Sequence, residues 1–394
     1  MRTIGVVTVA RSDYSAYQPV LHQIQEDKDL RLHLMVAGMH LSPEFGLTVR
    51  VIEEDGFEIN ERIEMQLSPD TPESIARSIG IGIIGFAQAY ARFCPDILLV
   101  LGDRYEMFSA VSAALPFKIP MAHIHGGEST EGLIDEAIRH SITKMSHLHF
   151  VSTEFYGKRV IQMGEEPWRV KVSGAPSLDN LNRIRLLSSE ELGKQYGFDL
   201  GNPFLLVTYH PVTLEYEQTG MQMRELLATL EELDRAVIFT YPNADTHSRL
   251  IIQMIQEFAA RRRAKILVNI GTQGYFSLMK YAAAMVGNSS SGIIEAASFK
   301  LPVVNIGNRQ RGRVRSRNVI DVGYNRVEIL KGLKEATSPE FRATLCDLVN
   351  PYGDGHAAER IIDHLKKITI DEQLLLKRFY DVGSIDANSI CRHS

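Results

Sequence analysis

The chain has 394 residues, more than one hydrophobic core usually supports, because single cores stop growing at roughly 250–300 residues. Two domains of comparable size are therefore expected. Hydrophobic residues make up 44% of the chain and charged residues 23%, an ordinary globular composition that excludes a long disordered region. The formal net charge of −5 argues against a nucleic-acid binder, which needs surplus positive charge to neutralise phosphates.

The cysteines and the N-terminal segment favour a cytoplasmic protein. Cys94, Cys346 and Cys391 are far apart and show no metal-ligand spacing, so isolated reduced thiols are the better interpretation. The first apolar run ends at Arg11 and Asp13 without a small-residue cleavage site, which argues against a signal peptide. No stretch approaches the ~20 apolar residues of a membrane span. We therefore expect a cytoplasmic location and no membrane partner.

Short apolar runs alternate with segments of helical period in the first half of the chain. Strands are expected at residues 4–10, 32–37, 97–101, 121–124 and 148–151. Helices are expected from about Ser15 and over about 134–145. Strands that are continuously apolar are covered on both faces, which is typical of a parallel sheet between two layers of helices.

The same pattern starts again after a seam at residues 173–176. Further strands are expected at residues 204–209, 236–240, 266–269, 283–286 and 303–306. The alternation predicts an α/β protein with two Rossmann-like, doubly wound domains. We place the first domain at 1–174 and the second at 175–369.

Polar residues gather directly after the predicted strands of both halves. They are Arg11-Ser12-Asp13, His40, Gly102-Asp103-Arg104, His125-Gly126-Gly127-Glu128, His210, Asn243 and the segment 287–292. In open α/β sheets, ligands bind at the carboxyl ends of the strands. The placement therefore predicts one active site in the cleft between the domains.

The segment 287–292 joins a buried strand to a helix. Its small residues let the backbone approach a ligand closely, and the amides at a helix start attract an anion. Ser289, Ser290 and Ser291 add hydroxyl donors, more than an N-cap needs, which favours binding of a diphosphate. Glu295 follows in the helix and would accept hydrogen bonds from ribose hydroxyls or complement the helix dipole.

Charged residues provide candidates for proton transfer and phosphate binding. Asp103 could act as a general base and Arg104 could hold a phosphate, although a helix N-cap explains the pair equally well. Glu128 and Asp135 could remove and return a proton at a sugar carbon, or Asp135 could form a salt bridge within its helix. Arg313 belongs to an alternating arginine series, of which we expect one or two members to reach a phosphate.

Two histidine pairs have the i, i+2 spacing that places side chains on one face of a strand. They are His123 with His125 and His147 with His149. Such a pair could chelate a metal together with a neighbouring carboxylate, but the spacing indicates no convincing third and fourth ligand. A metal hydrolase is thus a minor alternative, and His147 and His149 are expected to be structural.

Taken in order, the motifs resemble those of the hydrolysing UDP-N-acetylglucosamine 2-epimerases of sialic acid biosynthesis. The matching segments are 11–14, 38–40, 101–106, 123–128, 138–144, 210–213, 243–245, 287–292, 309–313 and 379–381. They keep their order over nearly the whole chain. The resemblance implies the GT-B architecture, with two Rossmann-like domains, an interdomain active-site cleft, and a C-terminal helix within 370–394 that packs back on the N-terminal domain.

The resemblance also implies a reaction. UDP-N-acetylglucosamine and water would give N-acetylmannosamine and UDP through a 2-acetamidoglucal, without a metal or redox cofactor, in a homodimer or homotetramer. Asp103 is implied for proton transfer, with Glu128, Asp135 and His125 for the second proton step or water activation. The implied substrate-binding residues are Arg11, Asp13, His40, Arg104, His210, Asn243, Ile270, Tyr275, Ser289, Ser290, Ser291, Glu295 and Arg313.

Other functions stay open. Close relatives in the same family act on UDP-2,4-diacetamido-2,4,6-trideoxyglucose for legionaminic acid, and the sequence does not identify the residues that distinguish the two sugars at C4 and C6. A non-hydrolysing epimerase, a GT-B glycosyltransferase and a sugar-nucleotide sensor are further alternatives, because fold does not determine function.

Overall fold

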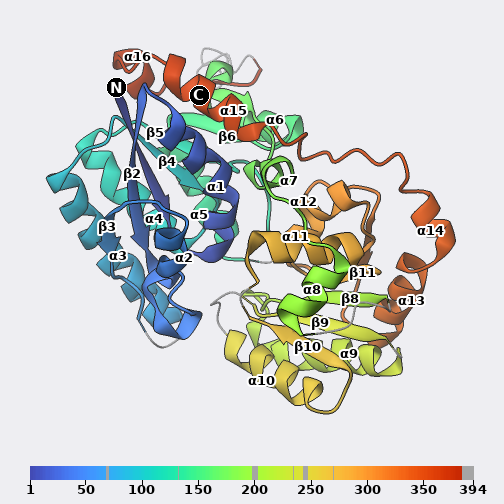
Figure 1. Ribbon diagram of the computed structural model, residues 1–394. Coiled ribbons are helices and arrows are strands. Elements are labelled where there is room, and N and C mark those ends of the chain that lie inside the picture. The colour runs from blue at the N-terminus through green and yellow to red at the C-terminus, as the bar shows by residue number, and fades with distance from the viewer. Residues whose placement is uncertain are drawn as a thin grey trace, which may run out of the picture.

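The computed structural model describes residues 1–67, 71–131, 133–197, 203–233, 235–242, 247–268 and 270–383. Two separate parallel sheets form the centres of two domains (Figure 1). The first sheet has the strand order β3-β2-β1-β4-β5-β6-β7, and the second has the order β10-β9-β8-β11-β12-β13. The predicted α/β class with two Rossmann-like domains is confirmed.

The first sheet is built from the N-terminal part of the chain. Its strands are β1 (Arg2–Thr8), β2 (Leu30–Ala37), β3 (Ile59–Ile63), β4 (Ile97–Leu101), β5 (Met121–Ile124), β6 (Leu148–Val151) and β7 (Val170–Val172). The helices are α1 (Arg11–Glu26), α2 (Val49–Glu54), α3 (Pro72–Arg92), α4 (Tyr105–Ala114), α5 (Asp135–Met145) and α6 (Glu154–Gln162). The central strands are buried along almost their whole length, as their continuous apolar sequences predict.

The second sheet repeats the arrangement. Its strands are β8 (Phe204–Thr208), β9 (Ala236–Thr240), β10 (Ala264–Leu267), β11 (Ala284–Gly287), β12 (Val303–Ile306) and β13 (Val319–Val322). Its helices are α8 (Ser189–Tyr196), α9 (Thr219–Glu232), α10 (Ser248–Ala259), α11 (Gly271–Tyr281), α12 (Ser290–Ile294), α13 (Arg326–Ala336) and α14 (Pro339–Ala343). The short α7 (Asn180–Arg183) lies in the connection between the two domains.

Three strands, β3, β7 and β13, were not predicted from the sequence. Each lies at the rim of its sheet and is partly exposed, so none is a continuous buried apolar run. In β3, the sequence Ile-Asn-Glu-Arg-Ile carries polar residues in the middle of the strand. The criterion that finds strands covered on both faces therefore passes over these edge strands.

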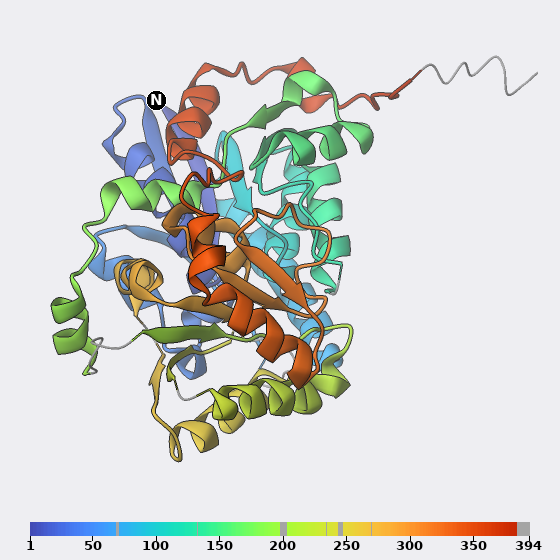
Figure 2. The ribbon, with the colours of Figure 1, turned by 90° about the vertical axis from the view of Figure 1, so that its right-hand side faces the viewer.

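The helix that returns to the first domain is α15 (Ala357–Lys367). Ala358, Ile361, Ile362 and Leu365 belong to the same buried cluster as the strands of the first sheet. Figures 1 and 2 show this helix on the N-terminal domain, after a long connection from α14. Within the segment 370–394, where a helix was also expected, the described residues form the short helix α16 (Glu372–Leu375), and its Leu374 packs into the same core cluster of the first domain.

The start of α15 is held by the connection between the domains. The Asp179 carboxylate, from this connection, accepts hydrogen bonds from Ala357 N at 2.9 Å and from Ala358 N at 2.6 Å. These amides at the helix N-terminus have no partner inside the helix, so the carboxylate stabilises the point where the chain re-enters the first domain. Among the described residues, every helix is too short or too polar to span a lipid bilayer.

The turn between β11 and α12 is tightly packed and requires glycine at position 287. Gly287 has a φ of 128°, and a Cβ there would lie 2.0 Å from the carbonyl oxygen of Thr208 on β8. We expect Gly287→Ala to lower the free energy of unfolding by about 3 kcal/mol, measured by urea denaturation.

The matched control is Gly80→Ala. Gly80 is exposed within α3, and a Cβ at this position would meet nothing within 4 Å. Because alanine favours the helix, this substitution should raise the unfolding free energy by about 0.5–1 kcal/mol. Equal stability of the two variants would contradict the requirement for glycine in the β11–α12 turn.

Candidate active site

A cavity lies between the domains, where the carboxyl ends of both sheets meet. Residues predicted from both halves of the sequence line it together. They are Arg11, Asp13, Asp103, Arg104, His125, Glu128, Asp135, His210, Ile270, Tyr275, Ser289, Ser290, Ser291, Glu295 and Arg313. His40 does not line this cavity, and Asn243 lies outside the described residues.

His40 is corrected from a substrate ligand to a support for the β1–α1 loop. Its side chain is completely buried, with Nε2 3.0 Å from Thr8 Oγ1 and Nδ1 2.7 Å from Thr48 Oγ1. Nε2 also lies 3.9 Å from Asp13 Oδ1. Burial lowers the pKa of His40 to about 3, so the ring is neutral and engaged by protein on both sides.

Asp13 holds the loop that carries Arg11. Its carboxylate accepts hydrogen bonds from the backbone N–H groups of Val9 and Ala10, each at 2.8 Å. Burial raises the pKa of Asp13 to about 6, although these amides work in the opposite direction. From this loop, Arg11 reaches across the cleft and donates to the carbonyl oxygen of Val268 at 2.6 Å. The two domains are thus linked at the rim of the cavity.

Asp103 follows β4 and forms an ion pair with Arg139 of α5. Arg139 is 1% exposed and also donates to the carbonyl oxygen of His125 at 3.2 Å. The Asp103 side chain remains 20% exposed, so the carboxylate is both oriented by Arg139 and open to the cavity. Arg139 was not among the predicted site residues, because its position one turn after Asp135 suggested an ion pair within the helix.

Glu128 lies at the centre of a buried network. Its Oε1 is 2.6 Å from His125 Nδ1 and accepts from Ser152 Oγ at 2.7 Å, while Oε2 is 2.9 Å from Arg313 Nη1. Burial raises the pKa of Glu128, but His125, Arg313 and the hydrogen bonds outweigh this effect and the pKa falls to about 2. Glu128 therefore stays ionised at neutral pH.

His125 adopts an uncommon backbone conformation at the end of β5. Its φ of 65° lies in the left-handed region, which non-glycine residues adopt only when their surroundings enforce it. The backbone is held by the hydrogen bond from Arg139 to the His125 carbonyl and by that from His125 N to the Phe150 carbonyl, at 3.1 Å. This conformation sets the ring against Glu128 at the cavity wall.

The second domain contributes small hydroxyl residues and one carboxylate. Ser289 caps α12 by accepting from Ser291 N at 3.4 Å, and both line the cavity together with Ser290. Glu295 accepts a hydrogen bond from Ser177 Oγ at 2.5 Å. Burial raises the pKa of the Glu295 carboxyl above its usual value. The closeness of backbone and hydroxyl donors makes this wall suitable for an oxyanion ligand.

His210 follows β8 on this wall and is surrounded by arginines from both domains. Burial lowers the pKa of His210 well below its usual value, and Arg309, Arg11 and Arg104 lower it further. Arg309 also donates to the Asn288 carbonyl at 3.1 Å, where Gln310 donates at 2.9 Å. The positive charge gathered beside His210 would favour an anionic group of a ligand at this point of the cavity.

The alternating arginine series divides into two groups. Arg309 and Arg313 line the cavity, and Arg309 was not among the nominated site residues. Arg311, Arg315 and Arg317 are at the surface, where they pair with Glu131, Asp321 and Asp347. Alternation alone does not indicate which arginines face the cleft, because the loop does not continue as a regular strand.

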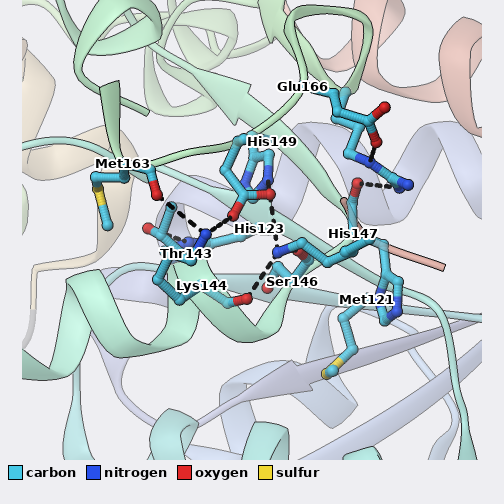
Figure 3. Close-up of polar contacts among 12 residues, drawn as sticks. Met121, His123, Thr143, Lys144, Ser146, His147, His149, Met163 and Glu166 are labelled. Atoms are coloured by element: carbon cyan, nitrogen blue, oxygen red, sulfur yellow. Dashed lines mark hydrogen bonds and ion pairs between the residues drawn. The ribbon is translucent and has the colours of Figure 1, made fainter. Parts of the chain in front are cut away.

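The strand histidines are bound to protein groups. His123 Nε2 is 2.7 Å from the Gly102 carbonyl oxygen, and His149 Nε2 is 2.9 Å from Glu165 Oε2. His147 Nδ1 accepts from Met121 N at 3.1 Å (Figure 3). In the part of the chain that the structure describes, no three His, Cys, Asp or Glu side chains are grouped to hold a metal ion.

Comparisons with known proteins give a consistent result. The family model described as UDP-N-acetylglucosamine 2-epimerase matches residues 22–366. A GDP/UDP-N,N′-diacetylbacillosamine 2-epimerase (hydrolyzing) of Campylobacter jejuni is 41% identical over 97% of this chain and 99% of its own length. A UDP-N,N′-diacetylbacillosamine 2-epimerase (hydrolyzing) of Legionella pneumophila is 38% identical, covering 96% and 99%.

The relatives named for UDP-N-acetylglucosamine that follow are less similar to this chain in sequence. A UDP-N-acetylglucosamine 2-epimerase of Neisseria meningitidis is 30% identical over 97% of this chain and 100% of its own length. The crystal structure of UDP-GlcNAc 2-epimerase from Neisseria meningitidis bound to UDP-GlcNAc has the same fold, with a TM-score of 0.81, 20% identity, and coverage of 93% and 100%. With a family model that spans most of its length and relatives this similar, the chain belongs to the UDP-N-acetylglucosamine 2-epimerase family.

Proposed function

We propose that the chain is a hydrolysing 2-epimerase whose substrate is UDP-N,N′-diacetylbacillosamine, that is, UDP-2,4-diacetamido-2,4,6-trideoxyglucose. The products would be UDP and the free 2-epimer, 2,4-diacetamido-2,4,6-trideoxymannose. One observation carries the choice of sugar: two relatives named for it are 41% and 38% identical over nearly their whole length, against 30% for the Neisseria relative named for UDP-N-acetylglucosamine. UDP-N-acetylglucosamine, the substrate implied by the sequence resemblance, becomes the alternative substrate.

The second domain is suited to the leaving group. The C2 hydrogen of the sugar has no neighbouring carbonyl to acidify it, so departure of UDP must supply much of the driving force. Hydroxyl and amide donors at Ser289, Ser290 and Ser291, with Arg309 and Arg313 nearby, would stabilise the charge that develops on the diphosphate. His210, neutral and beside the arginines, would donate a hydrogen bond to the same group.

The first domain is suited to the proton transfers. Asp103, oriented by Arg139 and open to the cavity, would remove the C2 proton as UDP leaves, which gives a glycal. Water then adds at C1 while a proton returns to C2, and we assign this step to Asp135, another carboxylate of the first domain at the cavity. Glu128 has a pKa of about 2 and is ionised at neutral pH, so it has no proton to return to C2. Its role would be to orient His125 and Arg313.

The remaining expectations rest on the family resemblance alone. We propose a cytoplasmic homodimer or homotetramer that needs no metal or redox cofactor. The catalytic assignment follows the same resemblance, supported by the way the cavity brings together side chains from strands far apart in the sequence. A GT-B glycosyltransferase is the second candidate, since two Rossmann-like domains serve both reactions.

The substrate is tested by proton NMR in deuterated water. The purified protein is incubated separately with UDP-N,N′-diacetylbacillosamine, its GDP counterpart and UDP-N-acetylglucosamine. We expect release of UDP and of the free manno sugar with deuterium at C2 from the first compound, at a kcat/KM at least tenfold above the others. Faster turnover of UDP-N-acetylglucosamine would identify that sugar nucleotide as the substrate. Absence of turnover with all three compounds would contradict the epimerase proposal and favour a glycosyltransferase.

The general base is tested with Asp103→Asn. The amide keeps the shape of the side chain but accepts no proton, so kcat should fall at least about 100-fold. Because the residue lies on the sugar side, the Kd for UDP, measured by calorimetry, should stay within about twofold of the wild-type value. Asp347→Asn, which removes an exposed carboxylate paired with Arg317, is the control and should leave kcat unchanged. A wild-type kcat in Asp103→Asn would contradict the assignment.

A further inference from the structure

The described C-terminal tail, residues 372–380, lies against the far side of the first domain from the cavity wall. Arg169, 1% exposed, donates to the carbonyl oxygens of Gln373 and Leu374, each at 2.8 Å. Tyr380 N donates to the Gly164 carbonyl at 2.9 Å. These contacts fix the tail on both sides of Lys377, so the position of that side chain is well defined.

Lys377 is bound at the C-terminal end of α5. Its Nζ donates to the carbonyl oxygens of Lys144 at 2.7 Å and Ser146 at 2.5 Å, and lies 2.8 Å from Glu165 Oε2. Figure 3 shows Lys144 and Ser146 at this end of the helix, next to His149. Carbonyl groups in the last turn of a helix have no partner within it and carry partial negative charge, which a cation stabilises. Lys377 therefore caps α5 from a distant part of the chain.

Besides capping α5, Lys377 helps to neutralise the buried carboxylate of Glu165. The carboxylate is completely buried and binds His149 Nε2 at 2.9 Å and Lys144 Nζ at 2.6 Å as well as Lys377. Burial raises the pKa of Glu165, but His149, Lys377 and Lys144 outweigh it and lower the pKa to about 2. Burial also lowers the pKa of His149, so the two lysines provide the positive charge that balances Glu165.

The opposite end of α5 reaches the candidate active site. The helix has 11 residues and spans about 16 Å as one rigid element. Asp135 in its first turn lines the cavity, and Arg139 one turn later pairs with Asp103. A shift of α5 along its axis would therefore move both groups relative to the sugar.

Besides the Arg139–Asp103 ion pair, a series of polar contacts joins α5 to the loop that carries Asp103. The Thr143 hydroxyl donates to the Arg139 carbonyl at 3.0 Å and lies 3.2 Å from His123 Nδ1. The other ring nitrogen of His123 lies 2.7 Å from the carbonyl oxygen of Gly102, the residue before Asp103. His123 and His149 are register partners on β5 and β6, so the histidine that holds this loop is the neighbour of the histidine that binds Glu165.

We propose that Lys377 is a positioning residue for the epimerase reaction: by capping α5 and balancing Glu165, it holds Asp135 and Arg139 in register with Asp103. The inference rests on the proposed function. It assigns the effect to the proton transfer on the first domain, because the serine and arginine groups that suit the diphosphate lie on the second domain. Loss of Lys377 should thus slow cleavage of the C2–H bond without weakening UDP binding.

The test compares Lys377→Met with Lys367→Met in the full-length protein. Lys367 is exposed on α15 and pairs with Asp363 at the surface, so its replacement should change little. We expect kcat to fall at least tenfold in Lys377→Met, with the Kd for UDP within twofold of wild type. The primary isotope effect on kcat with C2-deuterated substrate should rise, because C2–H cleavage becomes more strongly rate-limiting.

Three results would overturn the proposal: a wild-type kcat in Lys377→Met, an equal loss in Lys367→Met, or an unchanged isotope effect together with weaker UDP binding. Should Lys377→Met fail to fold, Lys377→Gln decides, since glutamine can still donate to the helix carbonyls but carries no charge. An intermediate kcat with a raised isotope effect supports positioning, and a wild-type kcat contradicts it. An inactive wild-type protein would instead contradict the proposed function, so the two failures are distinguishable.

Discussion

The buried ion pair between Glu128 and Arg313 is the contact on which the geometry of the cavity depends. It joins the end of β5 in the first domain to the arginine loop of the second, with both side chains less than a tenth exposed. Breaking a buried pair leaves an uncompensated charge, which is strongly unfavourable, so the pair constrains how the two domains meet. Tyr156 supports the same junction, because its hydroxyl accepts a hydrogen bond from Val314 N at 2.8 Å.

Around this pair, the two walls of the cavity offer different groups to a ligand. The first domain supplies the carboxylates Asp103, Glu128 and Asp135 together with Arg11 and Arg104, whereas the second supplies the serine turn, Arg309, Arg313 and Glu295. Such a division suits a reaction in which one end of the substrate loses a proton while the other leaves as an anion. In the proposed reaction the two events concern adjacent carbons of one sugar, and a cleft between two rigid sheets places both walls within reach of it.

Part of the site could not be predicted because its residues act through partners far away in the sequence. Arg139 looked like the member of a pair within its own helix, but it crosses to Asp103, which lies 36 residues earlier. His40 follows a strand as ligands do, yet the short helical turn from Gly38 to Leu41 directs its ring into the core between Thr8 and Thr48. The position of a residue after a strand indicates the edge of the sheet, whereas the direction of its side chain depends on the loop.

The sequence alone was enough to predict the two parallel sheets and to nominate residues that mostly meet at one cavity, because strands buried on both faces are continuously apolar and their carboxyl ends gather polar residues. The edge strands became visible only in the folded chain, since their half-exposed sequences carry no such signal. The same holds for the packing of α15 against the first domain and for the contact of Lys377 with Glu165. Those contacts join residues hundreds of positions apart, and local sequence patterns report only on neighbours within a few turns.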